Sequence, residues 1–243
     1  MQDRLPERPS GRVYFGEEAC ERRLPSARAY ADAVRRLKKA GAPATLVFPP
    51  LTDAGVEKAR AVLRELKGAA VECVVNDYGM LELARREAPR LELVIGRLLS
   101  RVLAKNIIDL HAYSAKEYAS FCAFLNERRV VRFDFDVFSL DLLKCGLAAL
   151  PVPASLYTPF DLAAFTRRCT IAGSAAPDAA PFAACRQECR GLAFDVSHAY
   201  LDGAYFIYEN LVLRYSPEPA KTDARIDRIV RWHPPDLRLG RRP

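Results

Sequence analysis

The chain has 243 residues, of which 50% are hydrophobic and 28% are charged, a balance typical of a folded globular protein and not of a disordered chain. This length is enough for one large domain with a sizeable core. No run of about eighteen apolar residues occurs, which excludes a membrane-spanning helix, and the polar start lacks the apolar stretch of a secretory signal. We therefore expect a soluble, cytoplasmic protein.

A net charge of +7 raises the question of nucleic-acid binding. The arginines are spread along the chain, and pairs such as Arg35-Arg36 and Arg85-Arg86 fall on the solvated faces of expected helices. A nucleic-acid interface should instead cluster on one element and alternate with exposed aromatic residues. We therefore expect a small-molecule substrate and no nucleic-acid partner.

Short apolar runs alternate with amphipathic segments through the first two thirds of the chain. Residues 13–16 form an apolar run closed by glycine, and segment 26–39 carries apolar residues at three- and four-residue spacing on one face, as in a helix that packs on a core. The strands expected are 13–16, 45–48, 71–75, 91–95, 130–138 and 152–158, and the helices expected are 26–39, 53–67, one capped by Asn76-Asp77, and 115–127.

This alternation predicts an α/β fold, with a parallel sheet joined by helical crossovers. The number of units favours a (β/α) TIM-like barrel over an open doubly wound sheet. No glycine-rich phosphate loop follows the first strand, which lowers the expectation of nucleotide binding. We expect residues 1–243 to form a single barrel domain.

The alternation of strand-like and helix-like segments ends beyond residue 150. Segment 166–181 is rich in small residues and has no periodic apolar face, whereas 204–215 reads as a β-hairpin that turns at Glu209-Asn210. A last strand is expected at 226–232. We interpret 165–216 as a cysteine-rich insertion between two barrel strands.

The insertion contains Cys169, Cys185 and Cys189. A C-x3-C pair places both thiols on one side of a helical turn, where they can bind one metal centre. A closed thiolate site needs a fourth ligand, and Cys20 is the candidate. It follows the first strand, and loops after parallel barrel strands open on the same face as the insertion. By spacing alone, plain packing, a zinc site and another metal centre all remain open.

The other cysteines are expected to be structural. Cys73 lies in an expected strand, Cys122 lies on the inward face of an expected helix, and Cys145 lies in an apolar segment. Buried free cysteine is a common packing residue.

Several motifs resemble, in the same order along most of the chain, those of the UbiV-type branch of the collagenase-like peptidase family (peptidase group U-32). The first strand and the residues after it, with Glu17, Cys20 and Arg22-Arg23, resemble the branch's Tyr-Leu-Gly-Glu, cysteine and paired-arginine signature. The further matching segments are Asn76-Asp77-Tyr78-Gly79, Gly96-Arg97-Leu98-Leu99, Asn106, Arg168-Cys169 and the Cys185-x3-Cys189 pair.

The resemblance implies a barrel in which Cys20, Cys169, Cys185 and Cys189 hold a 4Fe-4S cluster, with zinc as the alternative metal. It implies work with a homologous UbiU-type subunit, as a heterodimer, in oxygen-independent hydroxylation of the ubiquinone ring. Other relatives are linked to hydroxylation of RNA bases or to proteolysis. A protease of this family, and a non-catalytic scaffold for a homologous subunit, are the alternative functions.

The chain departs from the family pattern in two places. The family barrel begins with a strand and a helix ahead of the Tyr-Leu-Gly-Glu strand, whereas in this chain only about twelve polar residues precede residue 13. Three explanations stay open: the start of the coding sequence is misplaced, the barrel is open and lacks its first β/α unit, or the barrel is closed by a partner. Segment 140–165 also differs, which leaves the substrate open.

Polar residues at expected strand ends should surround the mouth of the barrel. They are Glu17, Asn76, Asp77, Arg97, Asp134, Asp136 and Tyr157. Arg97 is the candidate for holding an anionic substrate group, because a guanidinium binds a carboxylate with two hydrogen bonds; a salt bridge to a strand-end acid is the alternative. Asn76, Asp77 and His198 are further substrate-binding candidates, and for His198 a purely structural role is the alternative. The sequence has no G-x-S-x-G or H-E-x-x-H motif, so serine-hydrolase and zinc-protease chemistry have no support.

Overall fold

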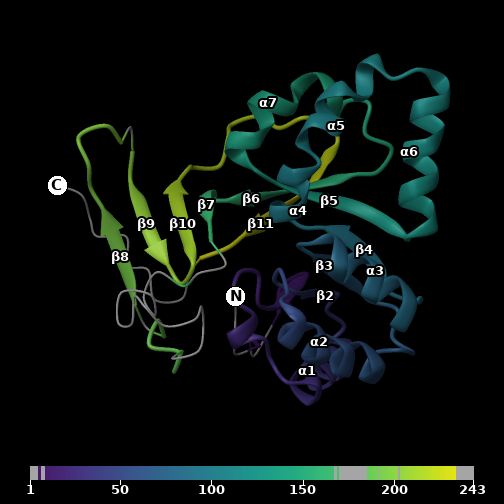
Figure 1. Cartoon of the computed structure of the whole chain (residues 1–243), viewed down its shortest axis with the longest axis vertical. Helices are drawn as coiled ribbons and strands as arrows, with labels where there is room; N and C mark the ends of the chain where they lie inside the picture. Colours follow the sequence, from purple (N-terminus) through teal and green to yellow (C-terminus); the bar gives the residue numbers. More distant parts are fainter. Residues whose placement is uncertain are drawn as a thin grey trace.

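Seven parallel strands form one sheet that curls into a half-barrel (Figure 1). The computed structural model describes residues 5–6, 9–166, 169, 185–190, 192–201 and 203–233. The strands follow one another across the sheet in the order β1-β2-β3-β4-β5-β6-β11. Their bounds are β1 Val13–Gly16, β2 Ala44–Val47, β3 Glu72–Val75, β4 Glu92–Ile95, β5 Val130–Asp136, β6 Ala154–Thr158 and β11 Ile226–Arg231.

Helices connect successive strands of this sheet. They are α1 Ala27–Lys39, α2 Asp53–Glu65, α3 Tyr78–Glu87, α4 Arg97–Val102, α5 Ala104–Asp109, α6 Ala115–Glu127 and α7 Val137–Leu147, with the short 3₁₀ helices η1 Glu21–Arg23 and η2 Leu110–Ala112. The side chains of Ser26, Asp77 and Ser114 accept hydrogen bonds from main-chain N–H groups in the first turns of α1, α3 and α6. Such caps satisfy N–H groups that have no partner inside the helix.

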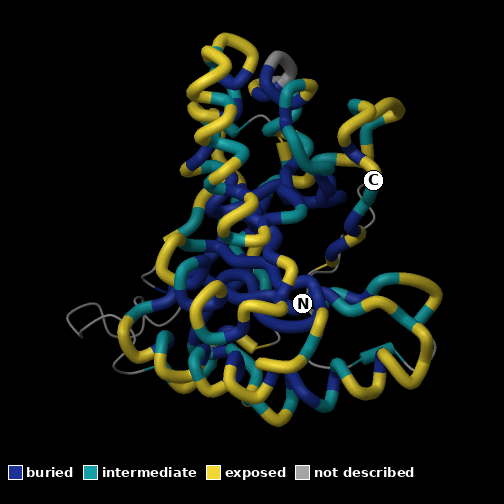
Figure 2. Tube along the Cα trace, turned by 90° about the vertical axis from the view of Figure 1, so that its right-hand side faces the viewer, coloured by how far each residue is buried: buried dark blue, intermediate teal, exposed yellow. Residues whose placement is uncertain are grey.

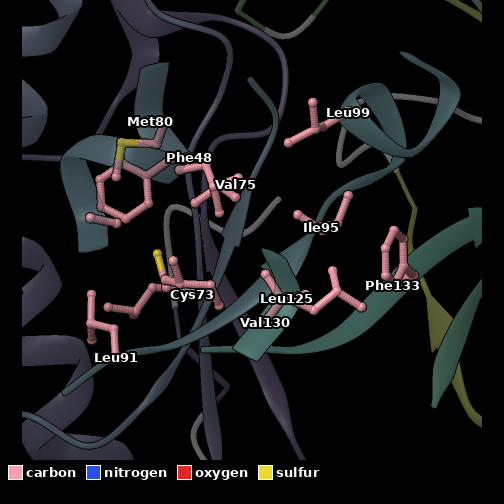
Figure 3. Packing of buried hydrophobic residues seen from close by; sticks show 14 of the residues in the cluster. Phe48, Cys73, Val75, Met80, Leu91, Ile95, Leu99, Leu125, Val130 and Phe133 are labelled. Carbon is pink, nitrogen blue, oxygen red and sulfur yellow. The ribbon is translucent and has the colours of Figure 1, made fainter. Parts of the chain in front are cut away.

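The main core lies between the outer face of the sheet and the helices. Phe48, Cys73, Val75, Met80 and Ile95 are completely buried there (Figure 3). Alternate residues of a strand point to opposite faces, so each strand gives only half of its side chains to this core. Figure 2 shows the same division, with buried chain in the sheet and exposed chain on the outer helices.

A second, antiparallel sheet follows β6 in the chain. Its strands, in spatial order, are β7 Phe160–Phe165, β10 Leu211–Tyr215, β9 Tyr205–Tyr208 and β8 Ala193–Val196. Phe160, Phe206 and Leu213 pack with Val74 and Val94 from the inner face of the parallel sheet. The small sheet therefore covers part of the inside of the half-barrel.

The parallel α/β architecture is confirmed, and the strand and helix bounds agree with the expected ones to within a few residues. Among the described residues the sheet is open, with β1 and β11 as its two edge strands, which agrees with an open barrel. The segment ahead of β1 includes Pro6 and Pro9, which cannot donate main-chain hydrogen bonds to a sheet.

Residues 137–138 were expected to end a strand, but they begin α7. The helices α4, α5 and α7 were not predicted. The antiparallel sheet also begins at Phe160, ahead of the expected insertion, whose segments 167–168 and 170–184 lie outside the described residues. Within the described part of the chain, no helix has the length and apolarity needed to cross a membrane.

Candidate functional site

The loop after β1 places acidic residues and a cysteine at the carboxyl edge of the sheet. Gly16 ends the strand with a φ of 134°, a backbone conformation that residues other than glycine rarely adopt. One carboxylate oxygen of Glu17 then accepts hydrogen bonds from the main-chain N–H groups of Glu18 and Ala19, at 2.9 and 3.1 Å. These bonds hold a tight turn in which Glu17, Glu18 and Cys20 are all buried.

Arg97, at the start of α4, is completely buried beside this loop. Its Nε and Nη2 donate to the two carboxylate oxygens of Glu18 at 2.9 and 2.5 Å, and its Nη1 donates to Asp136 Oδ1 and to the main-chain oxygen of Phe160, each at 2.8 Å. The guanidinium also lies over the ring of Tyr157, 4.3 Å from its centroid. Burial alone would lower the pKa of Arg97, but the charges of Glu18 and Asp136 raise it well above its usual value.

These contacts correspond to the salt-bridge alternative for Arg97. All of its nitrogen atoms donate to protein oxygens, so a substrate carboxylate could reach it only by displacing Glu18 or Asp136. The buried ion pair also explains why two acids can be held in the interior, because each carboxylate there has a charged partner.

The other predicted substrate-binding residues have structural contacts. Asn76 donates from Nδ2 to the main-chain oxygen of Phe48 at 2.9 Å and accepts from the main-chain N–H of Leu98 at 3.2 Å, which ties β3 to its two neighbours. Asp77 caps α3 and also accepts from the main-chain N–H of Leu51 at 2.7 Å. His198 is exposed beyond β8, where its Nδ1 accepts from the main-chain N–H of Tyr200 at 3.3 Å.

The segment that carries the C-x3-C pair lies against η1, the helix that directly follows Cys20. Gln187 donates from Nε2 to the main-chain oxygen of Arg22 at 2.7 Å. Cys20, Cys169 and Cys189 are buried, and Cys185 is half-buried. Residues 188–190 form a turn and residues 185–187 have no regular secondary structure, so the expected helical turn is not present between Cys185 and Cys189.

The hairpin turn between β9 and β10 also lies against η1 and the loop before it. Glu209 forms an ion pair with Arg23 of η1, and Asn210 donates from Nδ2 to the main-chain oxygens of Ala19 and Thr166 at 3.0 and 2.9 Å. Glu209 has a φ of 58°, the left-handed conformation common in such turns. The turn thus links the loop that carries Cys20 to the start of the insertion.

Burial governs the acid–base properties of this region. It raises the pKa of Cys20 to about 12 and that of Glu209 to about 8. It also raises the pKa of Cys189 to about 11, and the charges of Glu209, Cys169 and Cys185 add to the rise while Arg23 opposes it. Without a bound cation, Cys20 and Cys189 are therefore neutral thiols at pH 7.

No group of three or more histidine, cysteine or carboxylate side chains stands close enough to hold a single metal ion, among the residues that the structure describes. Each cysteine of a 4Fe-4S cluster binds a different iron, so its four sulfurs stand farther apart than ligands that share one ion. The described residues thus show no metal site, and both the 4Fe-4S cluster and the zinc alternative stay predictions.

Sequence reasoning missed Glu18, Glu209 and Trp232 at this edge of the sheet. Glu209 lay in a predicted turn, but nothing in the sequence indicated that it would be buried. Likewise, nothing in the sequence indicated that Trp232 would contact Arg97, whose guanidinium lies 5.0 Å from the indole centroid. Cys73 is buried in the main core and Cys122 is half-buried on α6, whereas the side chain of Cys145 lies outside the described residues.

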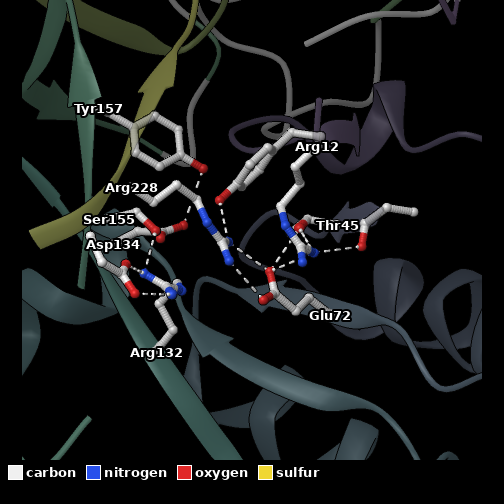
Figure 4. A network of polar contacts seen from close by, with 11 residues as sticks. Arg12, Thr45, Glu72, Arg132, Asp134, Ser155, Tyr157 and Arg228 are labelled. Atoms are coloured by element: carbon white, nitrogen blue, oxygen red, sulfur yellow. Dashed lines mark hydrogen bonds and ion pairs between the residues drawn. The ribbon is translucent and has the colours of Figure 1, made fainter. Parts of the chain in front are cut away.

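A polar network also lies inside the half-barrel, toward the amino ends of the strands (Figure 4). Glu72 accepts hydrogen bonds from Arg228 at 2.7 and 3.0 Å and from Thr45 at 2.8 Å, and it forms an ion pair with Arg12 at 3.1 Å. Arg228 also donates to the hydroxyl of Tyr14 at 2.9 Å. Edge strand β11 is thereby connected to β1 and β3 by side chains instead of main-chain pairing.

No family model, curated protein or solved structure matches this chain.

Proposed function

We propose that this chain is a UbiV-type member of the collagenase-like peptidase family and that its half-barrel is an open TIM-like barrel. In this proposal Cys20, Cys169, Cys185 and Cys189 bind a 4Fe-4S cluster. The chain then acts with a homologous UbiU-type subunit in oxygen-independent hydroxylation of a quinone precursor. The motif order along the sequence is the basis for the assignment.

One structural observation carries the proposal furthest, namely the contact between the segment of the C-x3-C pair and the helix after Cys20. The hydrogen bond from Gln187 to Arg22 and the ion pair between Glu209 and Arg23 bring together parts of the chain far apart in sequence. Thiolates suit iron–sulfur clusters in kind, and the low water access at Cys20 and Cys189 suits a redox centre.

Bound at this edge, a 4Fe-4S cluster supplies electron transfer. The chain's own residues have supporting roles. Glu17 fixes the loop of Cys20 through its two main-chain hydrogen bonds, and the Arg97–Glu18 pair holds that loop against α4. Since metal binding needs thiolates, loading the site must release the protons that Cys20 and Cys189 retain in the free chain.

Peptidase activity receives less support from the described residues. A cysteine nucleophile needs a lowered pKa and a nearby base, whereas the pKa values of Cys20 and Cys189 are raised. His198 is exposed, and its Nδ1 accepts a hydrogen bond from the main chain of Tyr200.

The deciding experiment is anaerobic purification followed by iron and sulfide analysis. We expect about four irons and four sulfides per chain, with a broad thiolate-to-iron absorption band. Cys185→Ala should lose most of both, whereas Cys122→Ala should keep them, because Cys122 lies on α6 away from the site. One zinc without sulfide, or iron retained in Cys185→Ala, would overturn the cluster assignment.

The hydroxylase role needs a separate test in cells. Deleting the gene should lower quinone levels under anaerobic growth and leave them unchanged in air. Complementation by the unaltered gene but not by Cys185→Ala would support a role for the cluster. Full complementation by that variant would favour the scaffold alternative.

A further inference from the structure

A cavity of about 600 Å³ lies on the open side of the half-barrel, between edge strands β1 and β11. This volume is within the range of sites that take small molecules, roughly 300–1,000 Å³. None of the four cysteines of the proposed cluster is among the described residues that line it. The cavity is therefore distinct from the cysteine residues, although Tyr157 and Trp232, which line it, also contact Arg97.

Aromatic side chains form much of its wall. Tyr14 and Tyr157 meet edge to face, with ring centroids 6.0 Å apart, and Trp232 and His233 continue the lining after β11. Such walls favour a flat ring over an aliphatic chain, because aromatic rings gain from stacked or edge contacts beyond the area they bury.

Trp232 adds an indole ring to the lining. The residue is only 6% exposed, and its Nε1 is buried without an acceptor among the described residues. Because solvent cannot reach Nε1, a ligand in the cavity contacts the ring of Trp232 and not its N–H.

The charge of the lining is positive. Arg12, Arg228 and Arg231 line the cavity, and no carboxylate does so within the described part of the chain. Behind the wall, Arg12 and Arg228 share the single carboxylate of Glu72 (Figure 4), so this cluster keeps one positive charge. Arg231, 73% exposed at its side chain, pairs with Glu218 at 3.0 Å.

We propose that this cavity binds a small planar aromatic anion, with its ring against Tyr14, Tyr157 and Trp232 and a carboxylate or similar group held by the guanidinium groups. The aromatic wall selects the ring, and the positive charge selects the anionic group. The proposal goes beyond the hydroxylase role, because it depends on neither the cysteines nor a metal.

Trp232 is the single tryptophan of the chain, so its fluorescence reports on the site directly. Benzoate is the probe, and cyclohexanecarboxylate and benzamide are matched controls that lack the aromatic ring or the charge. We expect benzoate to change the tryptophan emission saturably, and each control to bind roughly tenfold more weakly or less. No saturable change with benzoate, or equal binding of all three compounds, would overturn the proposal.

Two variants test whether Arg231 and the ring of Trp232 take part in binding, with calorimetry as the readout because Trp232→Leu removes the fluorophore. Arg231→Gln should weaken benzoate binding roughly three- to tenfold, and so should Trp232→Leu, which removes an aromatic ring from the lining. Arg36→Gln, an exposed change on α1, should have no effect. Unaltered binding in both cavity variants, with folding verified by circular dichroism, would contradict the assignment.

The same titration separates this proposal from the cluster assignment. Cys185→Ala should bind benzoate as the unaltered protein does, whatever its iron content. A loss of benzoate binding in Cys185→Ala would show that the cavity depends on the cysteine site and would overturn the proposal of an independent binding site.

Discussion

Gln187 and Arg22 are 165 residues apart in the sequence, yet the side-chain amide of Gln187 donates to the main-chain oxygen of Arg22 across 2.7 Å. The first of these residues lies between Cys185 and Cys189, and the second lies two residues after Cys20. A single hydrogen bond therefore joins the two cysteine-bearing segments. It is accompanied by the ion pair between Arg23 and Glu209, which fixes the hairpin turn at the same place.

The first prediction concerns thiol accessibility in the metal-free chain. Among the described cysteines, Cys122 and Cys185 are half-buried, whereas Cys20, Cys73, Cys169 and Cys189 are buried. We expect timed alkylation, followed by mass spectrometry, to label Cys122 and Cys185 first, because the reagent reaches only accessible thiols. Gln187→Ala should speed labelling of Cys189 and leave that of Cys73 unchanged. Early labelling of Cys20 in the unaltered chain would contradict the burial of its thiol beside η1.

The second prediction concerns the buried pair of Arg97 and Glu18. Arg97→Gln should lower the free energy of unfolding by about 3–5 kcal/mol, because it leaves the buried carboxylates of Glu18 and Asp136 without their charged partner. Denaturation in urea measures the change, and adding Glu18→Gln should restore part of the loss. As a control, Arg35→Gln breaks the exposed pair with Asp32 and should cost less than about 1 kcal/mol. Equal effects of the two arginine changes would contradict the prediction.

The third prediction concerns pH. Burial raises the pKa of Asp134 to about 7, and Tyr157 donates to one of its oxygens at 3.1 Å. Below pH 7 the folded chain keeps a proton on Asp134 that the unfolded chain releases from about pH 4 upward. The folded state is therefore favoured at low pH, and this contribution is lost as the pH rises toward 7 and beyond.

Urea denaturation at several pH values between about 5 and 8 tests this dependence. The free energy of unfolding should fall with pH in this window, because both Asp134 and Glu209 have raised pKa values, and Asp134 contributes up to about 1.4 kcal/mol per pH unit. Asp134→Asn should therefore reduce the slope and leave the part due to Glu209. Asp227→Asn is the control. Its carboxylate has a pKa lowered by Arg132 and stays ionised throughout, so the slope should persist. An unchanged slope in Asp134→Asn would assign the titration to another group.

The fourth prediction concerns the turn out of β1. A Cβ added at Gly16 would lie 2.2 Å from the main-chain oxygen of Val47, in a backbone with a φ of 134°. That oxygen already accepts a hydrogen bond from the hydroxyl of Tyr30 at 2.6 Å. Gly16→Ala should therefore lower the free energy of unfolding by at least about 2 kcal/mol.

Gly68→Ala is the matched control for this change. An added Cβ there meets nothing within 4 Å, and alanine restricts the unfolded chain, so the variant should be neutral or slightly more stable. Thermal denaturation of both variants measures the difference in their stability. A neutral Gly16→Ala would show that the loop carrying Cys20 leaves β1 by a different path.

Local pattern was enough to predict most elements of the parallel sheet. Periodicity placed α1 and α6 almost to the residue, because their caps, Ser26 and Ser114, and their apolar spacing are local signals. The same reasoning missed α7, whose sequence is apolar on most sides and continues from β5 without a break. It also identified the hairpin turn at Glu209-Asn210 from turn-forming residues alone.

The alternation of strands and helices could be predicted from the chain alone, since each element depends on residues a few positions apart. The folded arrangement was needed to show that the sheet is open, because closure depends on which strands meet at its two edges. It also decided the roles of the polar residues at the mouth. A guanidinium such as that of Arg97 can bind a substrate or an acid equally well, and its partner, Glu18, is 79 residues away in the chain; the fold alone brings the two together.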